Sequence, residues 1–160
     1  MPLSVVFWAR MRAVVQCVSR AKVTVSNALI GSIQKGFLVL LGVAPTDTDA
    51  IADAMIEKIV NLRIFDDSEG KMNLSLLDVK GSLLVVSQFT LYADCKKGRR
   101  PGFTDAAPPA FANEMYENFL KKCEAKGLTT QHGTFGAHME VELVNAGPIT
   151  IVLDSKELGF

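Results

Sequence analysis

One short apolar run, bounded by glycines, reads Gly36-Phe37-Leu38-Val39-Leu40-Leu41-Gly42-Val43. It is too short for a typical helix, so it predicts a strand that is buried inside a sheet. A second run, Leu83-Leu84-Val85-Val86, predicts another interior strand and leads directly into Ser87-Gln88-Phe89-Thr90-Leu91-Tyr92. Polar residues at the end of a buried strand are a common position for a functional site. The two runs therefore predict the centre of a sheet and a first candidate site.

Strand patterns also lie towards both ends of the chain. Residues 12–26 are rich in valine with polar alternation, which predicts a strand, a bend near Ser19-Arg20 and a second strand. Residues 139–143 alternate in the same way and predict a half-exposed strand. Asn145-Ala146-Gly147-Pro148 then predicts a turn before a last strand over residues 149–153.

Two main helices interrupt this strand-rich chain. The first is expected to begin near Pro45, where Asp47 or Thr48 can cap the free backbone N–H groups. The second is expected to begin at Pro108-Pro109. Because the helices do not alternate strictly with strands, the pattern favours an α+β single domain with largely antiparallel or mixed sheets. The expected apolar faces consist of Ala52, Met55, Ile56, Ile59 and Val60 in the first helix, and of Ala112, Met115, Tyr116, Phe119, Leu120 and Cys123 in the second.

The overall composition limits which partners and cofactors the protein is expected to have. The formal net charge is zero over 160 residues, so contact with RNA would have to come from a local basic patch. No apolar run reaches the ~20 residues that span a bilayer, and we expect no membrane partner. The three cysteines, Cys17, Cys95 and Cys123, have neither metal nor redox spacing, which indicates a reducing compartment and favours the cytoplasm. We expect no metal and no cofactor.

Domain boundaries are expected only near the termini. Met11 begins a pattern that resembles a natural start, so residues 1–10 are interpreted as an N-terminal extension of unknown role. They lack the basic region and the cleavage site of a signal peptide. The domain is expected over residues 11–155, followed by a tail over residues 156–160.

Three segments are candidates for chemistry, and each has a structural alternative. Thr90 offers a hydroxyl and Gln88 an amide, but a nucleophile needs a base and neither His lies in a recognisable motif, so spacing alone favours an ordinary strand end. Gly147-Pro148 permits unusual backbone geometry, although sequence alone favours an ordinary turn. The loop Lys96-Lys97-Gly98-Arg99-Arg100 can grip phosphates, and it fits a solvated charge run equally well.

Taken together, motifs along the chain resemble those of the D-aminoacyl-tRNA deacylases, the D-tyrosyl-tRNA deacylase family. The most specific are Ser87-Gln88-Phe89-Thr90 and the later Asn145-Ala146-Gly147-Pro148-Ile149-Thr150, in this order and spacing. The resemblance covers nearly all of residues 11–155. Further matching segments are Arg12-Ala13-Val14-Val15-Gln16, Asn61-Leu62-Arg63-Ile64-Phe65, Gly70-Lys71-Met72-Asn73, Gly98-Arg99-Arg100-Pro101 and Gly133-Thr134-Phe135-Gly136.

The resemblance implies a reaction and an assembly. The substrate would be an aminoacyl ester at the 3′-terminal adenosine of tRNA, hydrolysed to free tRNA and amino acid. Gly147-Pro148 would form a cis peptide whose carbonyls exclude L-amino acids while admitting D-amino acids and glycine. In the family this motif enters the partner subunit's pocket, so a homodimer is implied, with tRNA as partner and no DNA.

The resemblance also assigns residues to roles. Ser87, Gln88, Phe89 and Thr90 would form the catalytic segment, with the Phe89 and Thr90 N–H groups assisting a water that the tRNA 2′-hydroxyl helps to activate. Thr90 as a covalent nucleophile remains an alternative. The other implied residues are Phe135, Met139, Asn145 and Thr150 for substrate binding, with Phe135 and Met139 at the adenosine, and Lys96, Lys97, Arg99 and Arg100 for tRNA phosphates.

Two positions depart from the family pattern. Cys17 stands where an arginine associated with holding the Gly-Pro loop is usual, and His138 replaces a residue that is more often acidic.

Two rival functions are also considered. One is a related editing deacylase with an altered chirality preference, and the other is a non-catalytic tRNA-binding module. A third reading, a structural dimer without ligand, leaves the polar strand end unexplained.

Overall fold

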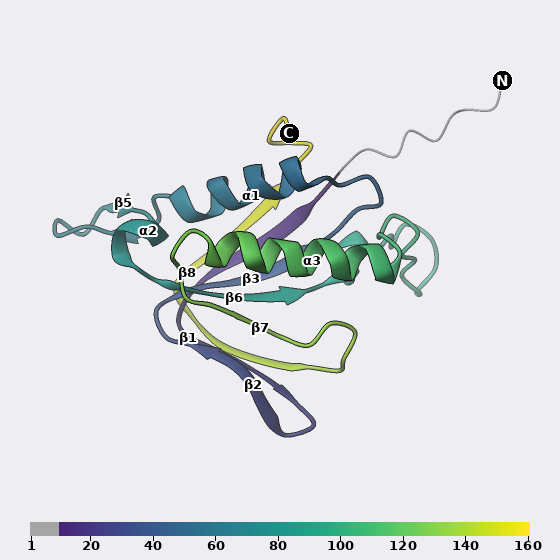
Figure 1. The fold of residues 1–160 in the computed structure, drawn as a ribbon, viewed down its shortest axis with the longest axis horizontal. Helices are drawn as coiled ribbons and strands as arrows, with labels where there is room; N and C mark the ends of the chain where they lie inside the picture. The colour runs from purple at the N-terminus through teal and green to yellow at the C-terminus, as the bar shows by residue number, and fades with distance from the viewer. Residues whose placement is uncertain (1–9) are drawn as a thin grey trace.

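The computed structural model describes residues 10–160, and its main sheet is mixed (Figure 1). The strand order is β2-β1-β3-β6-β7, and β8 pairs with β1. The β1–β2, β1–β3 and β1–β8 pairs are antiparallel, whereas β3–β6 and β6–β7 are parallel. The expected α+β class with mixed sheets is therefore confirmed. The strands are β1 (Arg12–Val25), β2 (Ala28–Ile33), β3 (Gly36–Gly42), β6 (Ser82–Ser87), β7 (Thr130–His132) and β8 (Glu140–Asp154).

The two continuous apolar runs form β3 and β6, the neighbouring central strands, as predicted. Phe37, Val39 and Val85 face one hydrophobic cluster, while Leu38 and Leu84 face a second cluster on the other side of the sheet. Because both faces of these strands are covered, their sequence is apolar at nearly every position instead of alternating. The ladder between them pairs Leu41 with Ser87, which places the polar strand end at the rim of the core.

The helices lie over one face of the sheet (Figure 1). Helices α1 (Asp49–Asn61) and α3 (Pro109–Glu124) pack the predicted apolar faces against the larger cluster. Thr48 is the N-cap of α1 and accepts from the Ile51 N–H at 3.2 Å. Asp47 is instead buried and accepts from the Ala44 N–H at 2.7 Å. The sequence did not predict the short elements α2 (Leu76–Val79) and the 3₁₀ turn η1 (Phe89–Tyr92).

Strands β1 and β8 differ from two expectations about the ends of the chain. Residues 12–25 form one continuous strand, so the bend expected near Ser19-Arg20 is only a shift in the β1–β8 register. The expected turn at residues 145–148 is also wrong, because β8 continues through it and pairs with β1 on both sides. Local turn chemistry at Gly147-Pro148 could not reveal this pairing with a strand about 130 residues away.

Two further short strands, β4 (Phe65–Asp66) and β5 (Met72–Leu74), form a separate antiparallel pair. Residues 1–9 of the expected N-terminal extension lie outside the described residues. Within residues 10–160, no helix is long and apolar enough to cross a membrane.

Candidate active site

The end of β6 continues into η1, which presents Phe89 and Thr90 at the surface. Ser87 and Gln88 are half-buried, and Phe89 is 56% exposed. The Gln88 N–H donates to the Leu41 carbonyl at 2.8 Å, so β3 holds the start of this segment. The N-terminus of η1 has no side-chain cap, and the first N–H groups of a helical turn have no partner within it. The Phe89 and Thr90 amides are therefore available to an acceptor from outside.

Residues 10–160 provide no base for Thr90. Its hydroxyl accepts a hydrogen bond from the Gln88 side-chain amide, and no described His, Asp or Glu side chain is hydrogen-bonded to it. His132 has its Nδ1 atom 2.6 Å from the Gly133 carbonyl, and His138 is exposed. Among residues 10–160 there is also no group of three or more His, Cys, Asp or Glu side chains arranged to hold a metal ion. The segment offers backbone donors and an amide, but no activated nucleophile.

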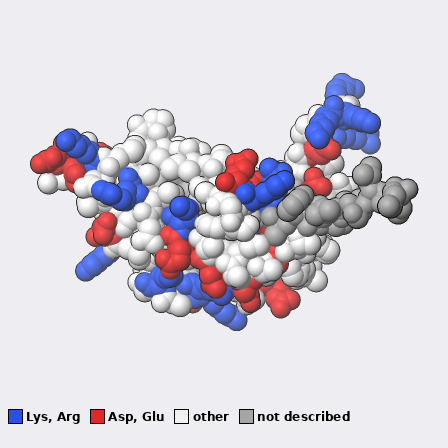
Figure 2. All heavy atoms as spheres, turned by 90° about the horizontal axis from the view of Figure 1, so that it is seen from above, with Lys and Arg blue, Asp and Glu red and all other residues white. Residues whose placement is uncertain are grey.

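The basic loop follows η1 and lies at one end of the molecule. Asp94 and Gly102 pair through two backbone hydrogen bonds, which close the loop at its base. Phe103, just beyond, packs edge-on against Phe89 with ring centroids 5.0 Å apart. Figure 2 shows a protruding group of basic side chains at this end. Its four cations are exposed, and none forms an ion pair with a described residue: Lys96, Lys97, Arg99 and Arg100.

The loop between β7 and β8 brings Phe135 and Met139 to the two sides of β6. Phe135 packs against Tyr116, with ring centroids 6.2 Å apart, and the Tyr116 hydroxyl donates to the Val85 carbonyl at 2.6 Å. Met139 packs on the other face of the sheet, in the cluster that contains Val86. The structure thus places both predicted adenosine-binding residues beside the strand that ends at Ser87.

Gly147-Pro148 lies in an irregular part of β8. Gln16 pairs with Thr150 and Val18 with Asn145, so residues 146–149 form a bulge opposite the single residue Cys17. The Gly147-Pro148 peptide is cis, as the resemblance implies, and both residues are exposed.

Hydrogen bonds within the motif close this bulge. Asn145 accepts from the Ile149 N–H at 3.2 Å and donates to the Thr150 hydroxyl at 3.0 Å. Cys17, by contrast, is 4% exposed and packs in the core. Asn145 and Thr150, predicted as substrate-binding residues, therefore lie where they also support the bulge from within, whereas Cys17 contributes packing.

The two halves of the predicted site are far apart in one chain. Cys17 lies opposite the bulge and is in register with Phe37 and then with Leu83. Three strand spacings and four residues separate that point from Ser87, which is roughly 20 Å along the sheet. The structure therefore brings Phe135 and Met139, but not Gly147-Pro148, towards the predicted catalytic segment.

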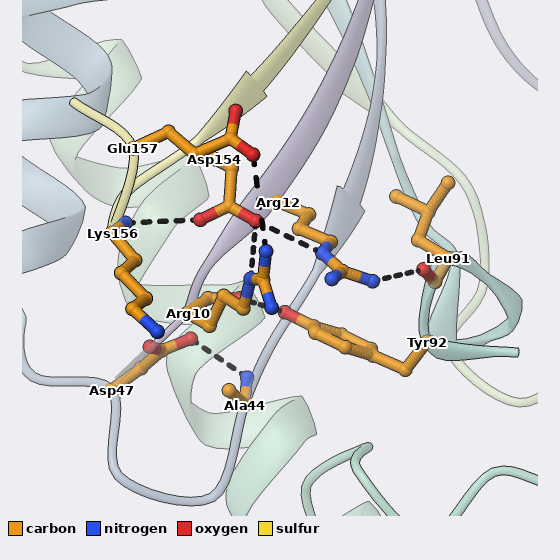
Figure 3. Close-up of polar contacts among 9 residues, drawn as sticks. All are labelled: Arg10, Arg12, Ala44, Asp47, Leu91, Tyr92, Asp154, Lys156 and Glu157. Atoms are coloured by element: carbon orange, nitrogen blue, oxygen red, sulfur yellow. Dashed lines mark hydrogen bonds and ion pairs between the residues drawn. The ribbon is translucent and has the colours of Figure 1, made fainter. Parts of the chain in front are cut away.

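A polar network behind η1 was not predicted from the sequence (Figure 3). Arg12 donates from Nε to Asp154 at 3.1 Å and from Nη1 to the Leu91 carbonyl at 2.8 Å. Arg10 donates to the same Asp154 oxygen at 2.5 Å. Burial works to raise the pKa of Asp154, but the hydrogen bonds from Arg10 and Arg12 outweigh it and hold that pKa below its usual value. Only the long-range β1–β8 pairing assembles these residues, so no local signal could have found them.

Residues 14–154 match the family described as D-Tyr-tRNA(Tyr) deacylase. The chain belongs to this family. A D-aminoacyl-tRNA deacylase of Clostridioides difficile (strain 630) is 62% identical over 147 residues, covering 92% of this chain and 99% of that protein. One of Thermosipho africanus (strain TCF52B) is 55% identical over 148 residues, with the same coverage. Membership in the D-Tyr-tRNA(Tyr) deacylase family identifies the chain as a hydrolase of the D-aminoacyl-tRNA ester, with tRNA as part of its substrate.

Solved structures share the fold. One titled "c-Myc DNA Unwinding Element Binding Protein" has a TM-score of 0.83 and 42% identity, covering 89% of this chain and 97% of that one. Another, titled as the structural analysis of a probable eukaryotic D-amino acid tRNA deacylase, has a TM-score of 0.80 at 18% identity, covering 91% and 99%. The second likeness supports the fold alone. It shows that the fold of this D-Tyr-tRNA(Tyr) deacylase family member also occurs at only 18% sequence identity.

Proposed function

We propose that this deacylase selects its substrate by chirality through the backbone of Gly147-Pro148. The carbonyls of the motif would crowd the position that an L side chain needs, leaving room for D-amino acids and for glycine, which has no side chain. The observation that carries this proposal is the bulge in β8, which exposes Gly147 and Pro148 and is closed by Asn145. A backbone held in this way can reject a substrate by steric exclusion, without reading its side chain.

The complete site is proposed to form between two copies of the chain. Within one chain, Gly147-Pro148 lies roughly 20 Å along the sheet from Ser87, so it cannot crowd a substrate at its own catalytic segment. In a twofold-symmetric dimer, each subunit's motif can reach the other subunit's segment, which gives two equivalent sites. The exposure of Phe89, of which 56% is accessible in the single chain, is consistent with a site that a second subunit covers.

The tRNA is proposed to lie along the rim that contains η1 and the basic loop. Phe135 and Met139 would hold the terminal adenine, because an aromatic ring can stack on a base. The tRNA phosphates would be contacted by Lys96, Lys97, Arg99 and Arg100. Because the chain has zero net charge, such contacts require a local basic patch of this kind. We also propose that the enzyme acts in the cytoplasm, together with its tRNA substrate.

Hydrolysis is proposed to depend on the substrate RNA and on backbone donors. A water attacks the ester carbonyl carbon, and the 2′-hydroxyl of the terminal adenosine orients this water. The Phe89 and Thr90 N–H groups donate to the oxygen that becomes negatively charged. Cleavage returns a proton to the 3′-oxygen and releases the amino acid. This route fits the absence of a described base beside Thr90.

One set of assays tests the proposal. Purified protein is incubated with D-tyrosyl-, L-tyrosyl- and glycyl-tRNA, and the remaining ester is quantified over time, while light scattering gives the mass in solution. We expect deacylation of the D and glycyl esters, little loss of the L ester and the mass of a dimer. Equal rates on the D and L esters would refute chiral selection, and tight tRNA binding without turnover would favour a binding module.

A further inference from the structure

Arg12 connects the sheet to the turn that carries Phe89 and Thr90 (Figure 3). Its guanidinium hydrogen-bonds to Asp154 at the end of β8 and to the Leu91 carbonyl within η1, at 3.1 and 2.8 Å. The same group lies over the Tyr92 ring, 5.1 Å from its centroid. One side chain therefore contacts both residues in the second half of η1.

Asp154 fixes this guanidinium from the other side. Asp154 is 5% exposed, and its carboxylate also accepts from Arg10 and from the Lys156 N–H. A buried carboxylate with several charge-assisted donors has little freedom to move. Because Asp154 belongs to β8 and Arg12 to β1, the orientation of the guanidinium is set by the paired strands of the sheet.

Tyr92 provides the second fixed point of η1. It is 3% exposed, and its hydroxyl donates to the Arg10 carbonyl at 2.6 Å. The ring packs so closely on β3 that a Cβ atom added at Gly42 would lie 2.7 Å from it. The second half of η1 is thus held on two sides, while Phe89 and Thr90 in the first half are exposed.

We propose that Arg12, held by Asp154, is a positioning residue that sets the orientation of η1 and so aims the Phe89 and Thr90 amides at the reacting ester. The inference rests on the proposed role of these amides in hydrolysis. Since η1 is a single turn of four residues, a rotation at Leu91 and Tyr92 is transmitted directly to Phe89 and Thr90. Arg12 itself does not touch the substrate.

The test compares Arg12→Lys with Lys22→Met as a matched control. Lysine keeps the charge but cannot bond to Asp154 and Leu91 in the planar geometry of a guanidinium. Lys22 forms an ion pair with Glu142 at 3.3 Å across the same two strands, without contacting η1. We measure kcat and KM on D-tyrosyl-tRNA, the thermal midpoint, and the ¹⁵N amide resonances of Phe89 and Thr90.

We expect Arg12→Lys to lower kcat roughly 10- to 100-fold, the effect of a small misplacement of catalytic groups, with KM within twofold and both amide resonances shifted. Lys22→Met should retain kcat. An unchanged kcat in Arg12→Lys, or an equal loss in both variants, would overturn the inference. If Arg12→Lys does not fold, Tyr92→Phe gives the same readout by releasing the other fixed point. If the proposed function fails, the wild-type protein itself will not prefer the D ester. If only the inference fails, the wild type will prefer the D ester and the comparison of variants alone will contradict it.

Discussion

Asn145 holds the backbone of Ile149, because its side-chain oxygen accepts from the Ile149 N–H at 3.2 Å across the bulge that contains Gly147-Pro148. Its amide nitrogen donates to the Thr150 hydroxyl at 3.0 Å. The Asn145 side chain therefore connects the first residue of the segment 145–150 to its last residue, Thr150. The proposed chirality filter is therefore closed by a side chain of β8 itself, between two residues, Asn145 and Thr150, that pair with β1.

Asn145→Ala is expected to weaken chiral selection. Removal of both hydrogen bonds leaves the Ile149 N–H without its acceptor and frees the bulge to move, which costs about 1 kcal/mol locally. We expect the ratio of D to L deacylation rates to fall roughly tenfold, the equivalent of about 1.4 kcal/mol. Asn145→Asp is the matched control, since it keeps the acceptor for Ile149 and should retain more of the ratio. An unchanged ratio in the alanine variant would show that the bulge holds its shape without Asn145.

Gly147→Ala is expected to abolish selective deacylation while the domain stays folded. Gly147 has a φ of +124°, and an added Cβ would lie 2.7 Å from Ile149 Cγ1 and 3.0 Å from the Ile149 nitrogen. The backbone must move to relieve these contacts. Gly127→Ala is the control, because Gly127 has a φ of +80° with nothing within 4 Å of the added atom. Deacylation assays and circular dichroism should show loss of activity in the first variant alone, and equal activity in both would contradict the role of this backbone.

Thr90→Ala is expected to retain deacylation within roughly tenfold of the wild type, because no residue in the described part of the chain offers the hydroxyl a base that would make it a nucleophile. The variant keeps the backbone N–H at this position. Single-turnover rates on D-tyrosyl-tRNA give the measurement, and a tRNA ending in 2′-deoxyadenosine provides the complementary test. The 2′-deoxy substrate should lose far more rate than the variant does. Complete inactivity of a folded Thr90→Ala that still binds tRNA would instead favour a covalent mechanism.

Asp47 is expected to make stability depend on pH. Burial raises its pKa to about 6, against the opposing hydrogen bond from the Ala44 N–H. A carboxyl group whose pKa is raised on folding stabilises the protein below its unfolded pKa, and this contribution is lost as the pH rises through 6. Asp47→Asn does not titrate, so its free energy of unfolding relative to the wild type should increase by on the order of 2 kcal/mol between pH 4 and pH 7.

Denaturant unfolding at several pH values measures this difference. Asp154→Asn is the contrasting variant, because the Asp154 pKa is lowered and its carboxylate stabilises the fold above the unfolded pKa. Its stability relative to the wild type should stay nearly constant over that pH range, which lies above the unfolded pKa of 3.8, and should rise only at lower pH, where the wild-type carboxylate becomes protonated. A flat difference for Asp47→Asn would show that Asp47 titrates normally.

Local patterns predicted the parts of this molecule that local physics determines. The apolar runs of β3 and β6 and the two amphipathic helices follow from periodicity, and the structure confirms them. Capping chemistry left Asp47 and Thr48 open for the first helix, and the structure shows Thr48 as the cap. The continuation of β8 through Gly147-Pro148 was missed because turn chemistry and a bulged strand require the same residue types. The contact between Arg12 and Leu91 was missed because 79 residues separate them. In each case the deciding interaction joins segments that are distant in sequence.

The pairing of β1 with β8 also sets the order in which the protein can fold. These strands join residues 12–24 to residues 140–154, so the sheet lacks one of its long members until residue 154 has left the ribosome. Contacts of such long sequence separation slow folding, because the intervening chain must be ordered first. Until then, the edge of β1 that pairs with β8 has no partner on the nascent chain. We therefore expect release of the last strand to trigger cooperative folding, and nascent chains that stop before β8 to depend on chaperones.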